Sequence, residues 1–167
     1  MIMKNLKQLT TLFSLLLFVS VTAFAGSGVT NPKPDDSIRT IQMKGTDQMK
    51  FDVTEIAAAP GERIRIVLTT VSRIPKAAMA HNVVVLDKGA DANAYANAAA
   101  MAADNEYLAP GLEDQVIAAT GLAGGGETVE VTFTVPEDSG EYEFICSFPG
   151  HYMAGMKGIL TVAQPAS

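Results

Sequence analysis

The sequence predicts an all-β domain: a Greek-key antiparallel β-sandwich of about eight short strands with one helical flap insertion. Segments that alternate apolar and polar residues recur along the chain, glycine and proline turn signals separate them, and one alanine-rich stretch breaks the pattern. An immunoglobulin-like sandwich fits this strand count equally well. That class is disfavoured because its paired cysteines and core tryptophan are missing from a chain with one cysteine and no tryptophan.

The first expected strands lie between residues 51 and 86. Phe51 and Val53 alternate with polar residues, and a Pro-Gly turn at 60–61 separates them from the next strand. In residues 63–68 three branched aliphatic side chains alternate with arginine and valine, which places one face in a core. Residues 81–86 form a largely β-branched run, which predicts a strand buried on both faces.

A helix and the remaining strands are expected after residue 90. The many alanines of residues 91–104 predict a helix of three or four turns with Asp91 as its N-cap. In a later strand Tyr142, Phe144 and Cys146 share one face, which directs Cys146 inward. Apolar alternation and β-branched content predict the strands of this half at residues 116–120, 129–135, 142–146 and 158–162.

The N-terminal residues have the pattern of a signal peptide for export. Two lysines precede the apolar run at 12–21, and Ala23-Phe24-Ala25 has the small-x-small pattern of a signal-peptidase site. An uncleaved anchor is the alternative, but the apolar run is shorter than the ~20 residues of a membrane-spanning helix. We expect a soluble periplasmic protein without stable membrane insertion, divided into a signal peptide (1–25), a flexible lead-in (26–37) and a folded domain (38–163).

Charge and cysteine content narrow the possible functions. The formal charge of −6 becomes −8 without residues 1–25, which hold two lysines and no acid. An acidic chain without a basic cluster is a poor nucleic-acid binder, so no nucleic-acid partner is expected. The only cysteine, Cys146, excludes an intramolecular disulfide. Alone it is as consistent with a small buried hydrophobe as with a metal ligand.

The loop that follows Cys146 carries the chemistry. Cys146, His151 and Met156 place a thiolate, an imidazole and a thioether on one segment, and the only other histidine is His81. Each has an ordinary structural interpretation, but together they form a soft donor set that selects copper. Two histidines, one cysteine and a weak axial methionine are typical of an electron-transfer copper site. Zinc would more often use further thiolates or histidines, although it can occupy a His2Cys set.

Supporting residues are also visible in the sequence. Asn82 follows His81 directly, and we expect Asn82 and the backbone after Cys146 to hydrogen-bond the thiolate or to tie the two loops together. Glycine and proline restrain the loop, and the strands on either side anchor it. Such a site changes little between the cuprous and cupric states, which suits electron transfer.

Three segments carry a family resemblance: Gly-Thr-Asp-Gln-Met-Lys-Phe (45–51), Ile-Pro-Lys-Ala-Ala-Met-Ala-His-Asn (74–82) and Cys-Ser-Phe-Pro-Gly-His (146–151). They resemble the azurin and auracyanin group of the cupredoxins, from about residue 39 to 162. The resemblance implies a cupredoxin-like sandwich with a helical flap and one type 1 copper ion. It implies equatorial ligands at His81, Cys146 and His151 and an axial ligand at Met156.

Two features depart from azurins. Four residues separate His151 from Met156 instead of three, a spacing similar to that of auracyanin or plastocyanin, and the Met-Lys-Gly ending favours Met156 over Met153 as the axial ligand. Ala80 replaces the glycine whose carbonyl approaches copper in azurins, so a fifth contact is an open question. The disulfide usual in azurins is absent because the chain has one cysteine.

We therefore expect an exported blue-copper protein, not an enzyme, that shuttles single electrons between redox partners. A periplasmic copper-handling protein is the alternative. A protein that exchanges copper with partners would favour a more open and flexible set of ligands than this closed loop provides. A two-copper enzyme is disfavoured because its second site needs histidines beyond His81 and His151. The resemblance implies that the ring edge of His151 reaches an apolar surface patch where c-type cytochromes or a terminal reductase or oxidase would dock. We expect that patch to comprise Pro75, Met79, Phe148, Pro149, Tyr152 and Met153.

Overall fold

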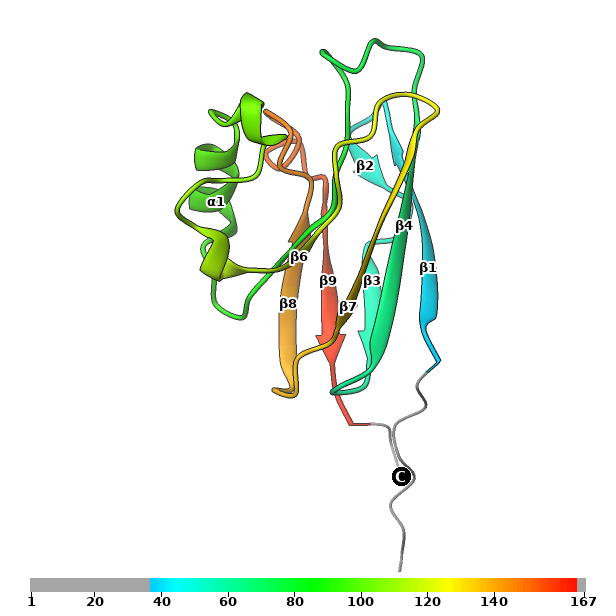
Figure 1. The fold of residues 1–167 in the computed structure, drawn as a ribbon, viewed down its shortest axis with the longest axis vertical. Helices are drawn as coiled ribbons and strands as arrows, with labels where there is room; N and C mark the ends of the chain where they lie inside the picture. The colour runs from blue at the N-terminus through cyan, green and yellow to red at the C-terminus, as the bar shows by residue number, and fades with distance from the viewer. Residues whose placement is uncertain (1–36, 165–167) are drawn as a thin grey trace, which may run out of the picture. The chain divides into compact units, whose positions relative to one another are not determined.

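The computed structural model describes residues 37–164, which form two β-sheets and one α-helix (Figure 1). One sheet has the strand order β2-β1-β4-β7, and the other has the order β3-β9-β8-β5-β6. The first sheet consists of β1 (Arg39–Thr46), β2 (Lys50–Phe51), β4 (Arg63–Val71) and β7 (Thr128–Thr134). The second consists of β3 (Glu55–Ala58), β5 (Val84–Leu86), β6 (Val116–Ala119), β8 (Gly140–Ile145) and β9 (Lys157–Val162).

The β-sandwich prediction is confirmed, with nine strands in place of about eight and with one difference in strand direction. Two pairs are parallel, β1 with β4 and β3 with β9, whereas an entirely antiparallel arrangement was predicted. The chain crosses from the first sheet to the second after β2 and returns after β3. A strand that returns to its original sheet after such a crossover can run in the same direction as the strand it left.

The core lies between the two sheets. Ile64, Ile66 and Leu68 of β4 are buried, as the alternation predicts. Tyr142 and Phe144 of β8 belong to the same buried cluster, so side chains of both sheets meet there. Each fully buried side chain of this size stabilises the fold by roughly 1.5–3 kcal/mol, which makes the sandwich a stiff support for the loops at its ends.

The helix α1 (Ala92–Ala99) is shorter than the predicted 91–104. Its start is as predicted, because the Asp91 side chain accepts hydrogen bonds from the amides of Asn93 and Ala94 at 3.0 Å. The helix ends where buried residues end: Met101 is 87% exposed, and only a short 3-10 turn follows at Ala103–Asn105. The prediction was too long because alanine propensity continues beyond the last residue that packs on the sandwich.

The helix and the sandwich form a second buried cluster. Ala92, Tyr95, Ala96 and Ala99 of α1 lie on the face that packs against the five-stranded sheet. A further 3-10 turn, Glu113–Gln115, leads from this flap into β6. The flap therefore covers the β5–β6 side of the second sheet (Figure 1).

Several loops meet at one end of the sandwich, the upper end in Figure 1. His81 is held there by two backbone hydrogen bonds with Ala123, 2.9 Å and 2.8 Å long. It forms an isolated bridge, and the strand predicted to begin at His81 begins only at Val84, although residues 81–86 are all buried as expected. The Cys146 amide donates to the Met156 carbonyl at 3.0 Å, which closes the loop between β8 and β9.

The predicted signal peptide (1–25) and nearly all of the predicted lead-in (26–37) lie outside the described residues. Among the residues that are described, no helix is long and apolar enough to cross a membrane.

Candidate metal centre

Three potential metal ligands converge at the loop end of the sandwich. The Nδ1 atoms of His81 and His151 lie 3.2 Å apart, and the Cys146 Sγ lies 3.9 Å and 3.4 Å from them, respectively. All three side chains are at most 2% exposed. Within residues 37–164 they form the one group of three histidine, cysteine or acidic residues whose ligand atoms lie close enough together to hold a metal ion.

The size of this triangle fits a transition-metal ion. The point equidistant from the two nitrogens and the sulfur lies about 2.0 Å from each of them, close to the ~2.0–2.3 Å that zinc keeps from imidazole nitrogen and thiolate sulfur. The donor set of two imidazoles and one thiolate is borderline to soft, which favours copper over magnesium or calcium. The spacing of the donors therefore suits a transition-metal ion, and their chemistry favours copper.

Met156 lies beside the same histidine. It is completely buried, and both its Cε and the His81 ring carbon Cδ2 lie within 3.0 Å of the point where a Cβ on Gly45 would sit. The thioether is therefore packed next to His81. Met153, the other methionine of the loop, is 69% exposed and its sulfur lies 3.7 Å from the Asn93 side-chain nitrogen, so Met153 does not share the buried site.

The backbone of Ala80 also faces the site. Its carbonyl oxygen lies 4.0 Å from the Cys146 Sγ, and the residue has no exposed surface. The alanine that replaces the glycine expected from the resemblance thus keeps its carbonyl close to the candidate ligands.

Burial sets the protonation states of the three ligand candidates. It lowers the pKa of His81 and of His151 from 6.5 to about 4, and for His151 the neighbouring His81 contributes to the shift. Burial also raises the pKa of Cys146 from 9.0 to about 12. Without metal at neutral pH, both imidazoles are neutral and the cysteine is a thiol. Binding of a cation therefore requires one proton to leave Cys146.

Asn82 links the two segments that carry the ligands, as predicted. Its Oδ1 accepts a hydrogen bond from the Ser147 amide at 2.9 Å, and its Nδ2 donates to the Ser147 Oγ at 2.9 Å. The Ser147 hydroxyl in turn donates to the Tyr107 carbonyl. The backbone amides of Asn82 and Phe148 also lower the pKa of Cys146, against the larger effect of burial, which favours the thiolate that a metal needs.

Sequence reasoning missed Ser147, Tyr107 and Gly45. Ser147 could have been noticed because it directly follows Cys146, and Gly45 because it opens one of the segments that carry the resemblance. Tyr107 has no local signal. It packs edge-on against Phe148, with ring centroids 4.9 Å apart, and Phe148 contacts the His151 ring at 4.8 Å.

The expected apolar patch is present in part. Pro75, Pro149 and Met153 are exposed and Tyr152 is half-buried. Met79 and Phe148 were expected in this patch but are buried, with 9% and 7% exposure. Phe148 instead packs between the rings of Tyr107 and His151.

Comparisons with known proteins agree with this geometry. Residues 39–163 match the family described as copper binding proteins, plastocyanin/azurin family. The chain is similar to azurin of Alcaligenes faecalis, with 37% identity over 127 residues that cover 74% of this chain and 98% of that protein. It is 33% identical to auracyanin-B of Chloroflexus aurantiacus over 145 residues, which cover 86% of this chain and 59% of that protein.

A solved structure shares the fold. Auracyanin A of Chloroflexus aurantiacus, described as a blue copper protein, superposes with a TM-score of 0.67 at 36% identity. The match covers 76% of this chain and all of that one.

Proposed function

Because the chain belongs to the plastocyanin/azurin family of copper-binding proteins, we propose that His81, Cys146, His151 and Met156 are the ligands of its copper ion. It is an azurin- and auracyanin-like blue copper protein, and its function is the electron transfer typical of that family rather than catalysis. One observation supports the ligand assignment above all: three buried donor atoms separated by 3.2, 3.4 and 3.9 Å.

The bound copper ion supplies the one-electron Cu(I)/Cu(II) couple. The role of the chain is to keep the ligands in nearly the same place in both oxidation states. His81 is fixed to Ala123 through its backbone, Asn82 joins the His81 segment to the Cys146 loop, and the loop is closed between Cys146 and Met156. Because the ligands move little between the two oxidation states, the reorganisation energy of electron transfer is small.

An electron would leave or enter through His151. Its ring is 2% exposed and lies in a loop whose outer residues, Pro149 and Met153, are exposed. A small apolar surface of this kind suits brief docking to a redox partner such as a c-type cytochrome or a terminal reductase or oxidase.

A charge at Met153 tests this docking surface. We expect Met153→Glu to slow electron exchange with partner proteins several-fold and to leave copper binding unchanged, because a desolvated carboxylate opposes apolar contact. Met101→Glu is the matched control, since Met101 is 87% exposed but lies on the flap. Equal exchange rates in the two variants would argue against docking at Met153. Stopped-flow mixing with a reduced cytochrome c measures the rates.

We also propose that the protein is exported to the periplasm and loses residues 1–25. The two lysines, the apolar run at 12–21 and the Ala-Phe-Ala sequence before Gly26 support this. The N-terminal sequence of the protein recovered from a periplasmic fraction should begin at Gly26. Recovery of the intact N-terminus in the membrane fraction would support an uncleaved anchor.

The copper site itself is tested by adding Cu(II) to metal-free protein. We expect a strong visible thiolate-to-copper band and a narrow copper hyperfine splitting in the electron-spin spectrum. Cys146→Ser should abolish the band, whereas Met156→Gln should keep bound copper and shift the reduction potential. A wild-type protein without the band would contradict the ligand assignment. Rapid loss of copper to a chelator would favour a copper-handling protein instead of an electron carrier.

A further inference from the structure

A chain of aromatic rings leads from the proposed copper ligand His151 to the flap. The centroid of the Phe148 ring lies 4.8 Å from that of His151 and 4.9 Å from that of Tyr107, distances typical of packed aromatic pairs. Exposure increases along this chain: His151 is 2% exposed, Phe148 is 7% exposed and Tyr107 is half-buried. Tyr107 is therefore the outermost ring of a continuous path that begins at the metal centre.

The Tyr107 ring packs against the core between the sheets, but its hydroxyl end is open to solvent. The hydroxyl has no hydrogen-bond partner in the described part of the chain, yet it is not among the buried side-chain atoms there that lack a partner. The hydroxyl is therefore not buried. The ring joins the buried end of the path to the surface of the flap.

The backbone around Tyr107 is fixed by neighbouring segments. Glu106 and Tyr107 both have positive φ, 51° and 59°, which residues other than glycine rarely adopt. Ser147, in the loop between β8 and β9, donates its hydroxyl hydrogen to the Tyr107 carbonyl, and the Tyr107 amide donates to the Ala102 carbonyl at 2.9 Å. An unfavourable backbone conformation persists where surrounding contacts impose it, and it is common at functional sites. These hydrogen bonds keep the Tyr107 ring against Phe148.

The surface around Tyr107 is acidic. Residues 87–115 hold six acidic residues and one lysine, a net charge of −5. Glu106 directly precedes Tyr107, and Asp104 lies in the 3-10 turn before it. All six acids are exposed and form no ion pair with another described residue: Asp87, Asp91, Asp104, Glu106, Glu113 and Asp114. A surface of this charge attracts a cationic partner.

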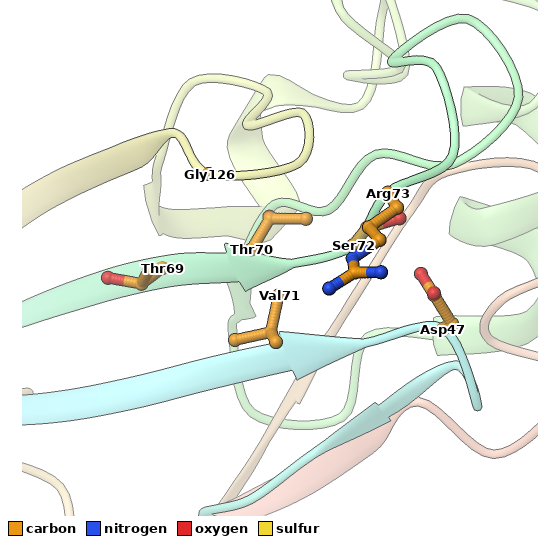
Figure 2. A pocket seen from close by; sticks show the side chains of 7 residues that line it. All are labelled: Asp47, Thr69, Thr70, Val71, Ser72, Arg73 and Gly126. Carbon is orange, nitrogen blue, oxygen red and sulfur yellow. The ribbon is translucent and has the colours of Figure 1, made fainter.

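The other side of the loop end, beside β1 and β4, has balanced charges. Figure 2 shows a hollow there, of about 500 Å³, with the Asp47 carboxylate and the Arg73 guanidinium on facing sides of it. Glu127, which follows a residue that lines the hollow, pairs with the Lys76 ammonium at 2.8 Å. A cationic partner is therefore attracted to the flap more strongly than to this side.

We propose that Tyr107, with Asp104 and Glu106 beside it, forms a second electron-transfer site, where a redox protein with basic residues around its own redox centre docks. Electron tunnelling slows steeply as the gap between donor and acceptor widens, and the Phe148 and Tyr107 rings bridge the gap between His151 and the surface. One electron moves in each event: the Cu(I) site becomes Cu(II), the partner is reduced, and neither ring is oxidised. This inference rests on the proposed function, because it requires copper at His151.

Two variants of Tyr107 test the path. Tyr107→Leu keeps an apolar side chain but loses the ring, whereas Tyr107→Phe keeps the ring. With Cu(I)-loaded protein, tris(phenanthroline)cobalt(III), a cationic one-electron oxidant, stands in for the basic partner. We expect it to oxidise Tyr107→Leu severalfold more slowly than the wild type and Tyr107→Phe at the wild-type rate. Stopped-flow absorbance at the blue band measures the rates.

Ferricyanide is the matched oxidant of opposite charge. The acidic flap repels this anion, so it should oxidise the wild type and both Tyr107 variants at equal rates. The reduction potential and the blue band should also stay unchanged, which separates a loss of the path from damage to the copper site. The inference is wrong if Tyr107→Leu reacts with the cobalt complex as fast as Tyr107→Phe does, or if both oxidants react more slowly with Tyr107→Leu by the same factor.

Removing acidic residues tests the docking charge. Asp104→Asn combined with Glu106→Gln should slow oxidation by the cobalt complex about threefold or more at low salt, and the difference from the wild type should shrink as the salt concentration rises. Glu137→Gln combined with Asp138→Asn is the matched control. It removes two exposed charges from the turn before β8, at the end of the sandwich away from Cys146. Equal rates in the two double variants would refute docking at the flap.

A binding measurement tests the same site without electron transfer. The chromium(III) analogue of the cobalt complex has the same charge, is not reduced by the protein and is paramagnetic, so it broadens the nuclear magnetic resonance signals of nearby amides. In Cu(I)-loaded protein it should broaden the signals of residues 104–107 before those of residues 149–153. The reverse order would overturn the Tyr107 site.

This binding measurement keeps the inference testable if Tyr107→Leu fails to fold, because it uses the wild-type chain. The outcomes also separate the two proposals. A wild-type protein without the blue band refutes the proposed function, whereas a blue wild-type protein with any contrary result refutes this inference alone.

Discussion

Replacing Gly45 by alanine would insert a methyl group into the wall of the metal centre. The new Cβ would lie 2.7 Å from the His81 Cδ2, 2.9 Å from its Cγ and 3.0 Å from the Met156 Cε. Non-bonded carbon atoms ordinarily stay about 3.5–4.0 Å apart, so His81, Met156 or the end of β1 must move by roughly 0.5–1 Å. Two proposed copper ligands would be displaced by one methyl group.

The free-energy change follows from two opposing effects. Overpacking a buried site typically costs about 1–3 kcal/mol. Alanine also restricts the unfolded chain, which stabilises the fold by about 0.4–1 kcal/mol where the backbone allows it, and Gly45 is not among the residues with positive φ. The steric effect is larger, and we expect a net loss of about 1–2 kcal/mol.

Urea unfolding of metal-free protein measures the loss, and the visible spectrum of the copper-loaded protein reports the displaced ligands. Gly121→Ala is the matched control. Its nearest contact would be the Glu106 Oε2 at 3.4 Å, and it also lacks a positive φ, so we expect it to be neutral or slightly stabilising. If Gly45→Ala unfolds like Gly121→Ala and keeps the wild-type spectrum, Gly45 does not shape the wall of the metal centre.

Two further outcomes are expected. Asn82→Ala should lower the free energy of unfolding by about 1–3 kcal/mol and alter the copper band, because the buried Ser147 amide loses its acceptor; urea denaturation and absorption spectra measure both effects. Metal-free protein should lose stability as pH falls from 6.5 to 4, on the order of 2–3 kcal/mol for each of His81 and His151, because the unfolded histidines bind protons that the folded ones do not. Urea midpoints at several pH values measure this loss of stability. Saturation with zinc should change the pH dependence, because the metal binds the same histidines.

Each expectation has a control. Asn97→Ala removes an exposed amide of α1 that donates to Asn93, and it should change stability by less than about 0.5 kcal/mol. If Asn97→Ala lowers the free energy of unfolding as much as Asn82→Ala does, the hydrogen bonds between Asn82 and Ser147 stabilise the fold no more than an exposed side-chain hydrogen bond. For the pH effect, His151→Gln should retain about half of the dependence. If the free energy of unfolding of His151→Gln depends on pH as steeply as that of the wild type, groups other than His151 cause the pH dependence.

Much of the fold follows from short-range patterns in the chain. The alternation in β4 identifies Ile64, Ile66 and Leu68 as core residues, because successive side chains of a strand point to opposite faces. Asp91 marks the start of α1 because its side chain satisfies amides two and three residues ahead. The end of α1 could not be predicted, since it depends on where the helix ceases to pack on the sandwich.

The sequence by itself determined the chemistry of the metal centre: Cys146, His151 and Met156 are close because one short loop carries them, and the donor types select copper. Only the tertiary structure decided what surrounds those donors. The parallel pairing of β1 with β4 and the close approach of Gly45 to the His81 ring join residues more than twenty positions apart in the sequence. Periodicity reports which face of a strand is buried but not which strand lies beside it, so these contacts follow from sheet order and register alone.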